Sequence, residues 1–161
     1  MERLWSPWRA RYIASGVDAQ KGGCVFCAIA SDPEHDEERF VLHRAQHCFV
    51  VLNLYPYITG HLMVVPYLHT SEFDSTPKEI TDEMMDQLKR AQTALREVYN
   101  PAGFNMGMNL GLAAGAGIAD HLHIHLLPRW GGDTNFMTSV GETRVLPEDL
   151  PTSYAKLKAK F

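Results

Sequence analysis

The stretch HLHIHLLPRW, residues 121–130, places a histidine at every second position: His121, His123 and His125. Successive side chains of a β-strand point to opposite faces, so the sequence predicts that the three imidazoles share one face and the apolar residues between them share the other. The apolar face would meet the core and the imidazoles a cleft. Three incidental histidines explain the pattern poorly, because crowding ionisable rings away from water costs stability unless a ligand or a reaction uses them.

Two uses for these histidines remain open from the residues alone. They could bind a catalytic zinc that keeps an open coordination position, or one imidazole could be a nucleophile while the others supply protons and hydrogen bonds to an anion. Same-face neighbours on a strand stand about 6.6 to 7 Å apart, and His121 and His125 stand twice as far apart. This spacing favours the nucleophile for the set as a whole, although two of the histidines could share a metal.

The surrounding segments predict an α+β fold. CFVVLN (48–53) and HLMVVP (61–66) are rich in β-branched residues and predict a hairpin across the turn LYPYITG. FNMGMNL (104–110) and HLHIHLL (121–127) predict two further strands, joined by a loop of small residues. The order of elements indicates an antiparallel sheet of about five strands, with one long helix packed on it and a short C-terminal helix from Pro151 onward.

The long helix is predicted from apolar residues at three- and four-residue steps, which are Ile80, Met84, Leu88, Ala91, Leu95 and Val98. Thr76 is predicted to cap its start, with Pro77 in the first turn and Glu79 completing a capping box. Asn100 and Pro101 are predicted to end the helix.

Length and charge exclude several classes of protein. A chain of 161 residues predicts a single domain over 1–161, with an N-terminal arm at 1–23, a core at 24–135 and a C-terminal extension at 136–161. The net charge of −4 argues against a nucleic-acid polymer as partner. No apolar run reaches signal-peptide or transmembrane length, so we expect a cytoplasmic protein that does not enter a membrane.

The chain has three cysteines, Cys24, Cys27 and Cys48. An odd count without a secretion signal favours metal binding or redox chemistry at the C-x-x-C of Cys24 and Cys27 over a disulfide framework. Buried free thiols are the alternative. Cys48 is predicted to pack in the core, while His43 and His47 are candidate partners of the thiolates.

The pattern H-x-H-x-H followed by two apolar residues resembles the signature of the histidine triad family of nucleotide hydrolases and transferases. NLYPYITGHLMVVPYLH (53–69) and GFNMGMNLGLAAGAGIADHLHIHLLPRW (103–130) fall in the family's order. The beginning RLWSPWRARYI (3–13) and the segment PRWGGDTNFM (128–137) are similar to the microbial branch that acts on dinucleoside polyphosphates, which includes diadenosine tetraphosphate phosphorylases and hydrolases.

The resemblance implies a catalytic set of His123, His125, His121 and His61. His123 would attack the α-phosphorus of a nucleotide and form a covalent nucleotidyl-imidazole. A backbone carbonyl that accepts a hydrogen bond from its Nδ1 would leave the other nitrogen free to attack. His125 would donate to the phosphate or the leaving group, and His61 would support the cluster. Water or inorganic phosphate would then release the nucleotide.

The resemblance also implies nucleotide contacts. Asn53 matches the position near the ribose, although an Asn at the end of a strand is also typical of a turn. Asn109 matches a polar position facing the phosphates. Gly117 and Ile118 stand where many members place Gln with Ser or Thr, so we expect only backbone N–H groups to contact phosphate there. Arg129 and Trp130 could reach the second nucleotide, although Arg129 could equally be a surface charge.

Some family members hold a zinc ion, and the resemblance implies Cys24, Cys27, His69 and His121 as its ligands. Two thiolates and two imidazoles form a closed tetrahedral set, which suits a structural zinc and leaves no position for activated water. The arm residues Trp5 and Trp8 could stack on a base or anchor on a second subunit.

The predicted function is cleavage of a dinucleoside polyphosphate through His123, in a homodimer. One alternative is a nucleoside phosphoramidate or mononucleotide hydrolase. Another, from a different class, is a zinc-stabilised nucleotide-binding module with little turnover. His125 favours water as the acceptor, whereas the segment GGDTNFM favours phosphate.

Overall fold

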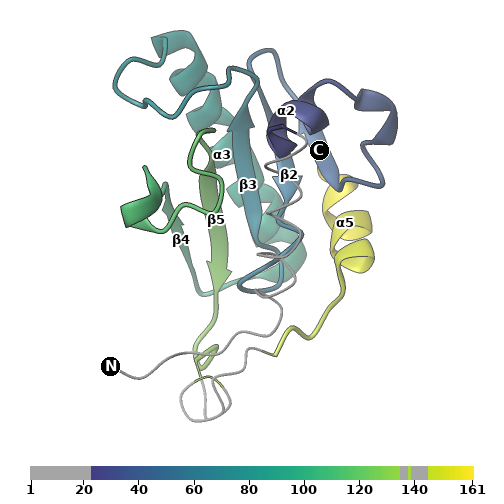
Figure 1. The fold of residues 1–161 in the computed structure, drawn as a ribbon. Helices are drawn as coiled ribbons and strands as arrows, with labels where there is room; N and C mark the ends of the chain where they lie inside the picture. The colour runs from purple at the N-terminus through teal and green to yellow at the C-terminus, as the bar shows by residue number, and fades with distance from the viewer. Residues whose placement is uncertain (1–22, 135–137, 139–144) are drawn as a thin grey trace.

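The computed structural model describes residues 23–134, 138 and 145–161. These residues form a five-stranded antiparallel sheet in the order β1-β2-β3-β5-β4. Figure 1 shows β2, β3, β5 and β4 side by side in that order. The strands are β1 (Val41–Arg44), β2 (Cys48–Leu52), β3 (Leu62–Pro66), β4 (Gly103–Gly107) and β5 (Ile124–Arg129). The helices are α2 (Val25–Ala30), α3 (Lys78–Tyr99) and α5 (Leu150–Lys158), with short 3-10 helices η1 (Pro33–His35) and η2 (Leu112–Ala114). The predicted fold class is therefore confirmed.

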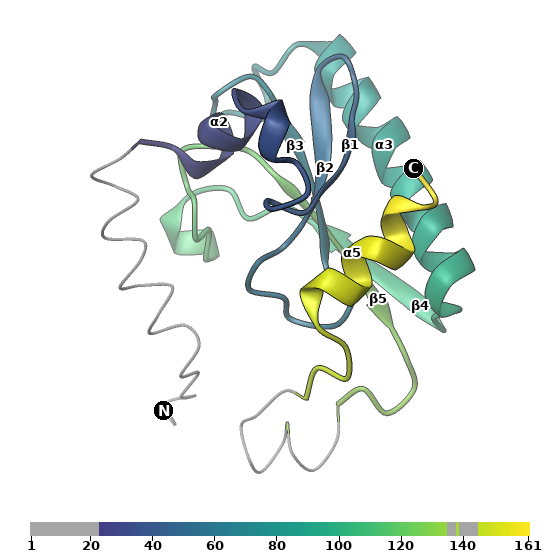
Figure 2. The same ribbon diagram turned by 90° about the vertical axis from the view of Figure 1, so that its right-hand side faces the viewer.

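The two faces of the sheet are covered by different helices (Figure 2). On one face α3 and α5 cover a core that includes Val50, Val64, Ile124 and Leu126. On the other face α2 packs Phe26 and its neighbours against a second set of buried residues, which are Ile29, Val41, Phe49, Val51, Met63 and Val65. The apolar residues of β5 thus face α3, as predicted, and the histidines between them lie on the side of α2.

The predicted hairpin is confirmed, with Val50 opposite Val64 and a hydrogen bond from Asn53 N–H to His61 O. Strand β5 begins at Ile124, three residues later than predicted. Two features of the chain explain this shorter strand. Pro66 has no N–H with which to extend the ladder, and Leu122 N–H donates to Thr70 O instead of to a strand.

The long helix begins and ends close to the predicted residues, but its N-cap was predicted wrongly. Pro77 occupies the N-cap without a side-chain hydrogen bond, because the Thr76 hydroxyl donates backward to Glu72 O. At the other end Asn100 adopts a left-handed conformation with φ 44°, and its N–H donates to Arg96 O. The short C-terminal helix is confirmed, and the Asp149 side chain caps it.

Strand β1 and helix α2 were not predicted, because four- and six-residue elements carry too little periodicity. Two arginines fix α2 to the sheet: Arg39 donates to Ala28 O, and Arg44 donates to the carbonyls of Ile29 and Ala30.

The predicted N-terminal arm lies outside the described residues except for Gly23, as does part of the extension at 136–161. No helix within the described ranges is long and apolar enough to cross a membrane.

Candidate functional site

The structure brings His61, His123 and His125 together on the α2 side of the sheet. The ring centroids of His123 and His125 lie 4.8 Å apart, and those of His61 and His125 lie 5.0 Å apart. All three side chains are buried, and His61 is fully buried. His61 directly precedes β3, and His125 pairs with Met63 across the ladder. Pairing of β3 with β5 therefore positions this histidine cluster.

Hydrogen bonds fix the proton positions in His61 and His125. His61 Nδ1 accepts from Tyr57 N–H at 3.2 Å and from the Asn53 amide at 3.3 Å, so the proton of neutral His61 sits on Nε2. His61 Nε2 lies 2.9 Å from His125 Nδ1 and donates to it. His125 consequently carries its own proton on Nε2 and presents an N–H donor.

In His123 the proton lies on the other ring nitrogen than in His61 and His125. Its Nδ1 lies 2.9 Å from the carbonyl oxygen of His121 and donates to it. The proton of neutral His123 is therefore on Nδ1, and Nε2 keeps a free lone pair. Two neighbouring imidazoles thus offer one lone pair and one N–H donor, which is the pairing that nucleophilic attack on a phosphate ester requires.

Burial keeps these rings neutral. It lowers the pKa of His61 to about 3 and that of His125 to about 4, with a smaller contribution from the neighbouring histidines. Burial also lowers the pKa of His123. A neutral His123 is the form that has a lone pair for attack at physiological pH.

A second cluster lies at the same end of the sheet and consists of Cys24, Cys27, His69 and His121. One ligand atom from each residue lies within 4.8 Å of all the others. His121 Nδ1 lies 3.2 Å from Cys24 Sγ, 3.6 Å from Cys27 Sγ and 3.2 Å from His69 Nδ1. In a tetrahedral zinc site neighbouring donors stand about 3.3 to 3.8 Å apart. The donor set and its spacing therefore fit zinc.

The proton of His121 is placed for metal binding. His121 Nε2 lies 2.8 Å from the carbonyl oxygen of Pro66 and donates to it, which leaves the Nδ1 lone pair facing the thiols. The ring of His121 thus belongs to the second cluster, while its backbone carbonyl holds the Nδ1 proton of His123. One residue connects the two clusters.

The rival metal ligands lie elsewhere. His43 lies next to Arg90, with its Nε2 3.0 Å from the guanidinium, and stacks on Phe161. His47 offers its backbone N–H to Glu83. Cys48 is fully buried in the core under α3, as predicted.

Of the predicted nucleotide contacts, Asn53 is bonded to the histidine cluster. Asn53 is engaged within the chain, because its amide donates to His61 and its carbonyl oxygen accepts from Tyr55 N–H. Asn109 is half-buried and Gly117 is exposed. Ile118 packs against the core under α2.

Arg129 does not extend freely from the end of β5. Its guanidinium binds both carboxylate oxygens of Asp133 and also donates to Asn105 Oδ1. Trp130 packs edge-on against Tyr99, with ring centroids 6.3 Å apart. Arg129 and Trp130 therefore both have contacts within the chain.

Three contributors to the site were not predicted. The Phe26 ring lies 5.4 Å from that of His121 and 5.1 Å from that of His123, so it packs against both clusters. Its position inside the C-x-x-C could have indicated this. The Tyr57 N–H and the Pro66 carbonyl are backbone groups, and no side-chain pattern marks them.

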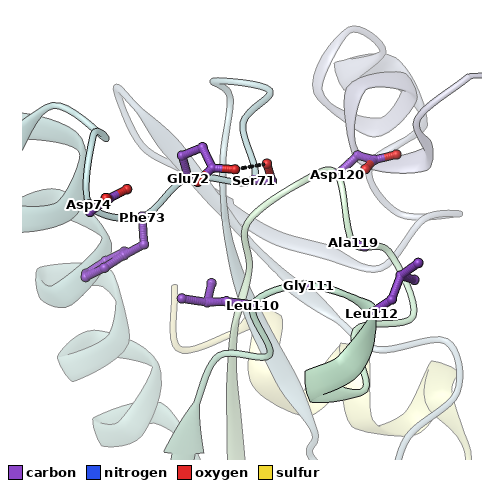
Figure 3. Close-up of a pocket in the computed structure, with 9 residues that line it drawn as sticks. All are labelled: Ser71, Glu72, Phe73, Asp74, Leu110, Gly111, Leu112, Ala119 and Asp120. Carbon is purple, nitrogen blue, oxygen red and sulfur yellow. Dashed lines mark hydrogen bonds between the residues drawn. The ribbon is translucent and has the colours of Figure 1, made fainter.

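A cavity of about 610 Å³ lies between the loop after β3 and the loops around η2 (Figure 3). None of the predicted site residues lines it. Its walls carry three carboxylates, those of Glu72, Asp74 and Asp120. Like charges repel, so this cavity is poorly suited to a polyphosphate chain.

Comparison with known sequences agrees with this architecture. The sequence profile described as HIT domain matches residues 34–132. The chain therefore belongs to the histidine triad (HIT) family, which confirms the resemblance predicted from the sequence. Among its relatives is the AP-4-A phosphorylase of Mycobacterium tuberculosis, 41% identical over 152 residues, with 92% of this chain and 78% of the relative covered.

Solved structures of the family share the fold. A Zn-bound histidine triad family protein from Mycobacterium smegmatis has a TM-score of 0.69 and 29% identity, with 86% of this chain and 92% of that chain covered. A HIT family protein from Bacillus anthracis has a TM-score of 0.61 and 28% identity, with 68% of this chain and 74% of that chain covered.

Proposed function

We propose that this chain is a nucleotidyl-transferring enzyme that cleaves dinucleoside polyphosphates such as diadenosine tetraphosphate through a covalent intermediate on His123. The observation that carries the proposal is the opposite polarity of two adjacent buried rings, a lone pair on His123 Nε2 and an N–H on His125 Nε2. The 41% identity to an AP-4-A phosphorylase supports an enzyme over a binding module and supports this class of substrate.

In the first step His123 Nε2 attacks the α-phosphorus and an N–P bond forms. The bond from phosphorus to the bridging oxygen breaks, and the leaving nucleoside polyphosphate takes the electron pair while His125 Nε2–H donates to it. The nucleotidylated ring of His123 is cationic, and the carbonyl of His121 stabilises it by accepting from Nδ1–H.

In the second step an acceptor attacks the same phosphorus and His123 leaves as neutral imidazole. With diadenosine tetraphosphate the first step releases ATP. Inorganic phosphate as acceptor then gives ADP, whereas water gives AMP. We assign nucleotide binding to Asn53 and Asn109 and to the backbone N–H groups of Gly117 and Ile118, which present no charged side chain to the phosphates.

We also propose that Cys24, Cys27, His69 and His121 hold a zinc ion. Zinc with four protein ligands supplies structural stability and no activated water. The four residues would then fix the start of α2 to the segment before β5, with Phe26 packed between the two clusters.

Strands β1 and β4 form the two edges of the sheet, and we assign the proposed homodimer to the edge at β4. Met106 on β4 is 49% exposed. A Met106→Asp substitution is expected to give a monomer in size-exclusion chromatography with light scattering. A wild-type chain that is monomeric at all accessible concentrations would contradict the dimer.

The decisive experiment is incubation of the purified chain with diadenosine tetraphosphate, with and without phosphate, followed by separation of the products. Phosphorolysis gives ADP and ATP, and hydrolysis gives AMP and ATP. Substrate binding without product formation would instead support a binding module. The phosphorus–nitrogen bond of the intermediate breaks in acid. The intermediate is therefore trapped under alkaline denaturing conditions and located by mass spectrometry on the peptide containing His123.

A further inference from the structure

The three cysteines differ in their access to solvent. Cys24 and Cys27 are half-buried, whereas Cys48 is fully buried. The Cys27 sulfur lies 3.3 Å from Nδ1 of His69, whose side chain is exposed. A small oxidant in water can therefore reach the C-x-x-C pair, while the core excludes it from Cys48.

The two accessible thiols are also close enough to react with each other. Cys24 is the N-cap of α2 and Cys27 lies in its first turn. Both sulfurs belong to a group of donor atoms that lie within 4.8 Å of one another. A disulfide needs a sulfur separation of about 2.05 Å, and cysteines in a C-x-x-C motif reach it in redox proteins.

We propose that Cys24 and Cys27 form an oxidative modification site, at which a hydroperoxide converts the metal-binding thiolates to a disulfide and thereby releases the metal. The proposal rests on the zinc site and the catalytic role of His123 set out above. It concerns a reversible chemical change of the second cluster, which neither the family's cleavage reaction nor a structural zinc requires.

The oxidation balances with hydrogen peroxide as the oxidant. The Cys27 thiolate attacks one peroxide oxygen, the O–O bond breaks, and a sulfenic acid and hydroxide form. The Cys24 thiolate then attacks the sulfenic sulfur, an S–S bond forms, and a second hydroxide leaves. Two sulfurs are each oxidised by one electron equivalent, and one peroxide is reduced to two water molecules after protonation.

The disulfide has a consequence for the histidine cluster. It removes two of the four metal ligands, so the ring of His121 loses the metal that fixes it. The carbonyl of the same residue orients His123. Oxidation is therefore expected to lower kcat about tenfold or more, as loss of a supporting contact does at metal and active sites. A thiol reductant with added zinc is expected to restore it.

The test treats the zinc-loaded full chain with hydrogen peroxide and follows four readouts. These are free thiols, disulfide mapping by mass spectrometry, zinc release to a chromogenic chelator, and turnover of diadenosine tetraphosphate. We expect one disulfide between Cys24 and Cys27, parallel zinc release, and an unmodified Cys48. A Cys48→Ala variant serves as matched control and is expected to respond like wild type.

Three results would overturn the inference. The first is oxidation of the pair only to sulfinic acids, and the second is a disulfide that includes Cys48. The third is complete Cys24–Cys27 disulfide formation with undiminished turnover. Thiols, disulfide and zinc are measured without turnover, so a chain that fails to cleave the substrate disproves the proposed function separately. Nitrogen NMR of the His123 ring gives an independent measure of coupling, since Nδ1 is expected to lose its fixed proton after oxidation.

Discussion

The histidine cluster and the cysteine–histidine cluster use the same side chain in opposite ways, although His121 and His123 are two residues apart. His121 donates from Nε2 to the Pro66 carbonyl and keeps its lone pair on Nδ1. His123 donates from Nδ1 to the His121 carbonyl and keeps its lone pair on Nε2. In each ring one backbone carbonyl, that of Pro66 for His121 and that of His121 for His123, decides which nitrogen is available. This choice separates the proposed metal ligand from the proposed nucleophile.

The clusters also differ in hydration. His61 is fully buried and His125 is nearly so, whereas His69 is exposed and the two nearby thiols are half-buried. The first cluster depends on exclusion of water to keep its rings neutral. In the second, the proposed metal would compensate for gathering four donor groups in one place.

Removing the nucleophile tests the comparison most severely. We expect His123→Ala to lower kcat about 10⁴-fold or more, because no other described ring combines a free Nε2 with a neighbouring N–H donor. The measurement is steady-state turnover of diadenosine tetraphosphate. His43→Ala on the opposite face is the matched control and should retain activity. Comparable activity in His123→Ala would show that the two rings have been assigned wrongly.

Removing the donor should cost less. His125→Ala leaves the lone pair of His123 intact and removes only the N–H that protonates the leaving group, so kcat is expected to fall about 10² to 10³-fold. A substrate analogue whose leaving group needs no proton should recover most of this loss. An equal defect with both substrates would contradict the role of His125 as donor.

Acid should destabilise the buried cluster. Unfolded histidines protonate near pH 6.5, whereas the pKa is about 4 for His125 and about 3 for His61 in the folded chain. Between these values the unfolded state binds more protons than the folded state. The contribution of the buried histidines to the free energy of unfolding is therefore fully present above about pH 6.5 and is lost as the pH falls. From His125 alone we expect a loss of about 3 kcal/mol by pH 4, since one unit is worth about 1.4 kcal/mol.

This loss is measured by urea unfolding between pH 7 and pH 4. His35→Gln is the control, because His35 lies exposed beside Asp32, which raises the pKa of that histidine, and the variant should retain the acid destabilisation. A free energy of unfolding that stays constant over this range would refute neutral burial of the cluster.

Changes in the second cluster should affect the first indirectly. His69→Ala is expected to reduce bound zinc and to lower kcat about 10 to 100-fold, whereas His69→Cys keeps four ligands and should preserve both. Metal content by mass spectrometry and turnover are compared across the pair. If His69→Ala loses zinc and keeps full activity, the clusters are independent.

The smallest effect concerns the residue that orients His61. Asn53→Ala removes one donor to His61 Nδ1 while Tyr57 N–H remains, so kcat is expected to fall about fivefold, the equivalent of one hydrogen bond. Asn53→Asp should be worse, because a carboxylate draws the His61 proton to Nδ1 and reverses the polarity of His125. Because Asn53 is also assigned to nucleotide binding, KM is expected to rise as kcat falls, and an unchanged kcat would contradict the orienting role of Asn53.

The elements that depend on local periodicity were predicted from the sequence. The β2–β3 hairpin, the long helix and the common face of the histidines all follow from patterns of two or of three and four residues. The sequence did not predict β1 or α2, which are too short to show periodicity. It also missed the late start of β5, which depends on Pro66 and on the bond from Leu122 N–H to Thr70 O. The ring protonation of His61 and His121 could not be predicted either, since it is set by the backbone of Tyr57 and of Pro66.

The double role of His121 bears on which substitutions the chain can tolerate. Its ring is specific to histidine, but its carbonyl belongs to the backbone and is present whatever amino acid occupies position 121. A descendant of this chain could therefore abandon the metal by changing that side chain and still hold His123 in its reactive form, provided that packing alone kept the segment in place. The carbonyl that orients His123 is kept under any change of side chain at position 121, whereas the proposed metal ligand there must be retained by selection for the metal itself.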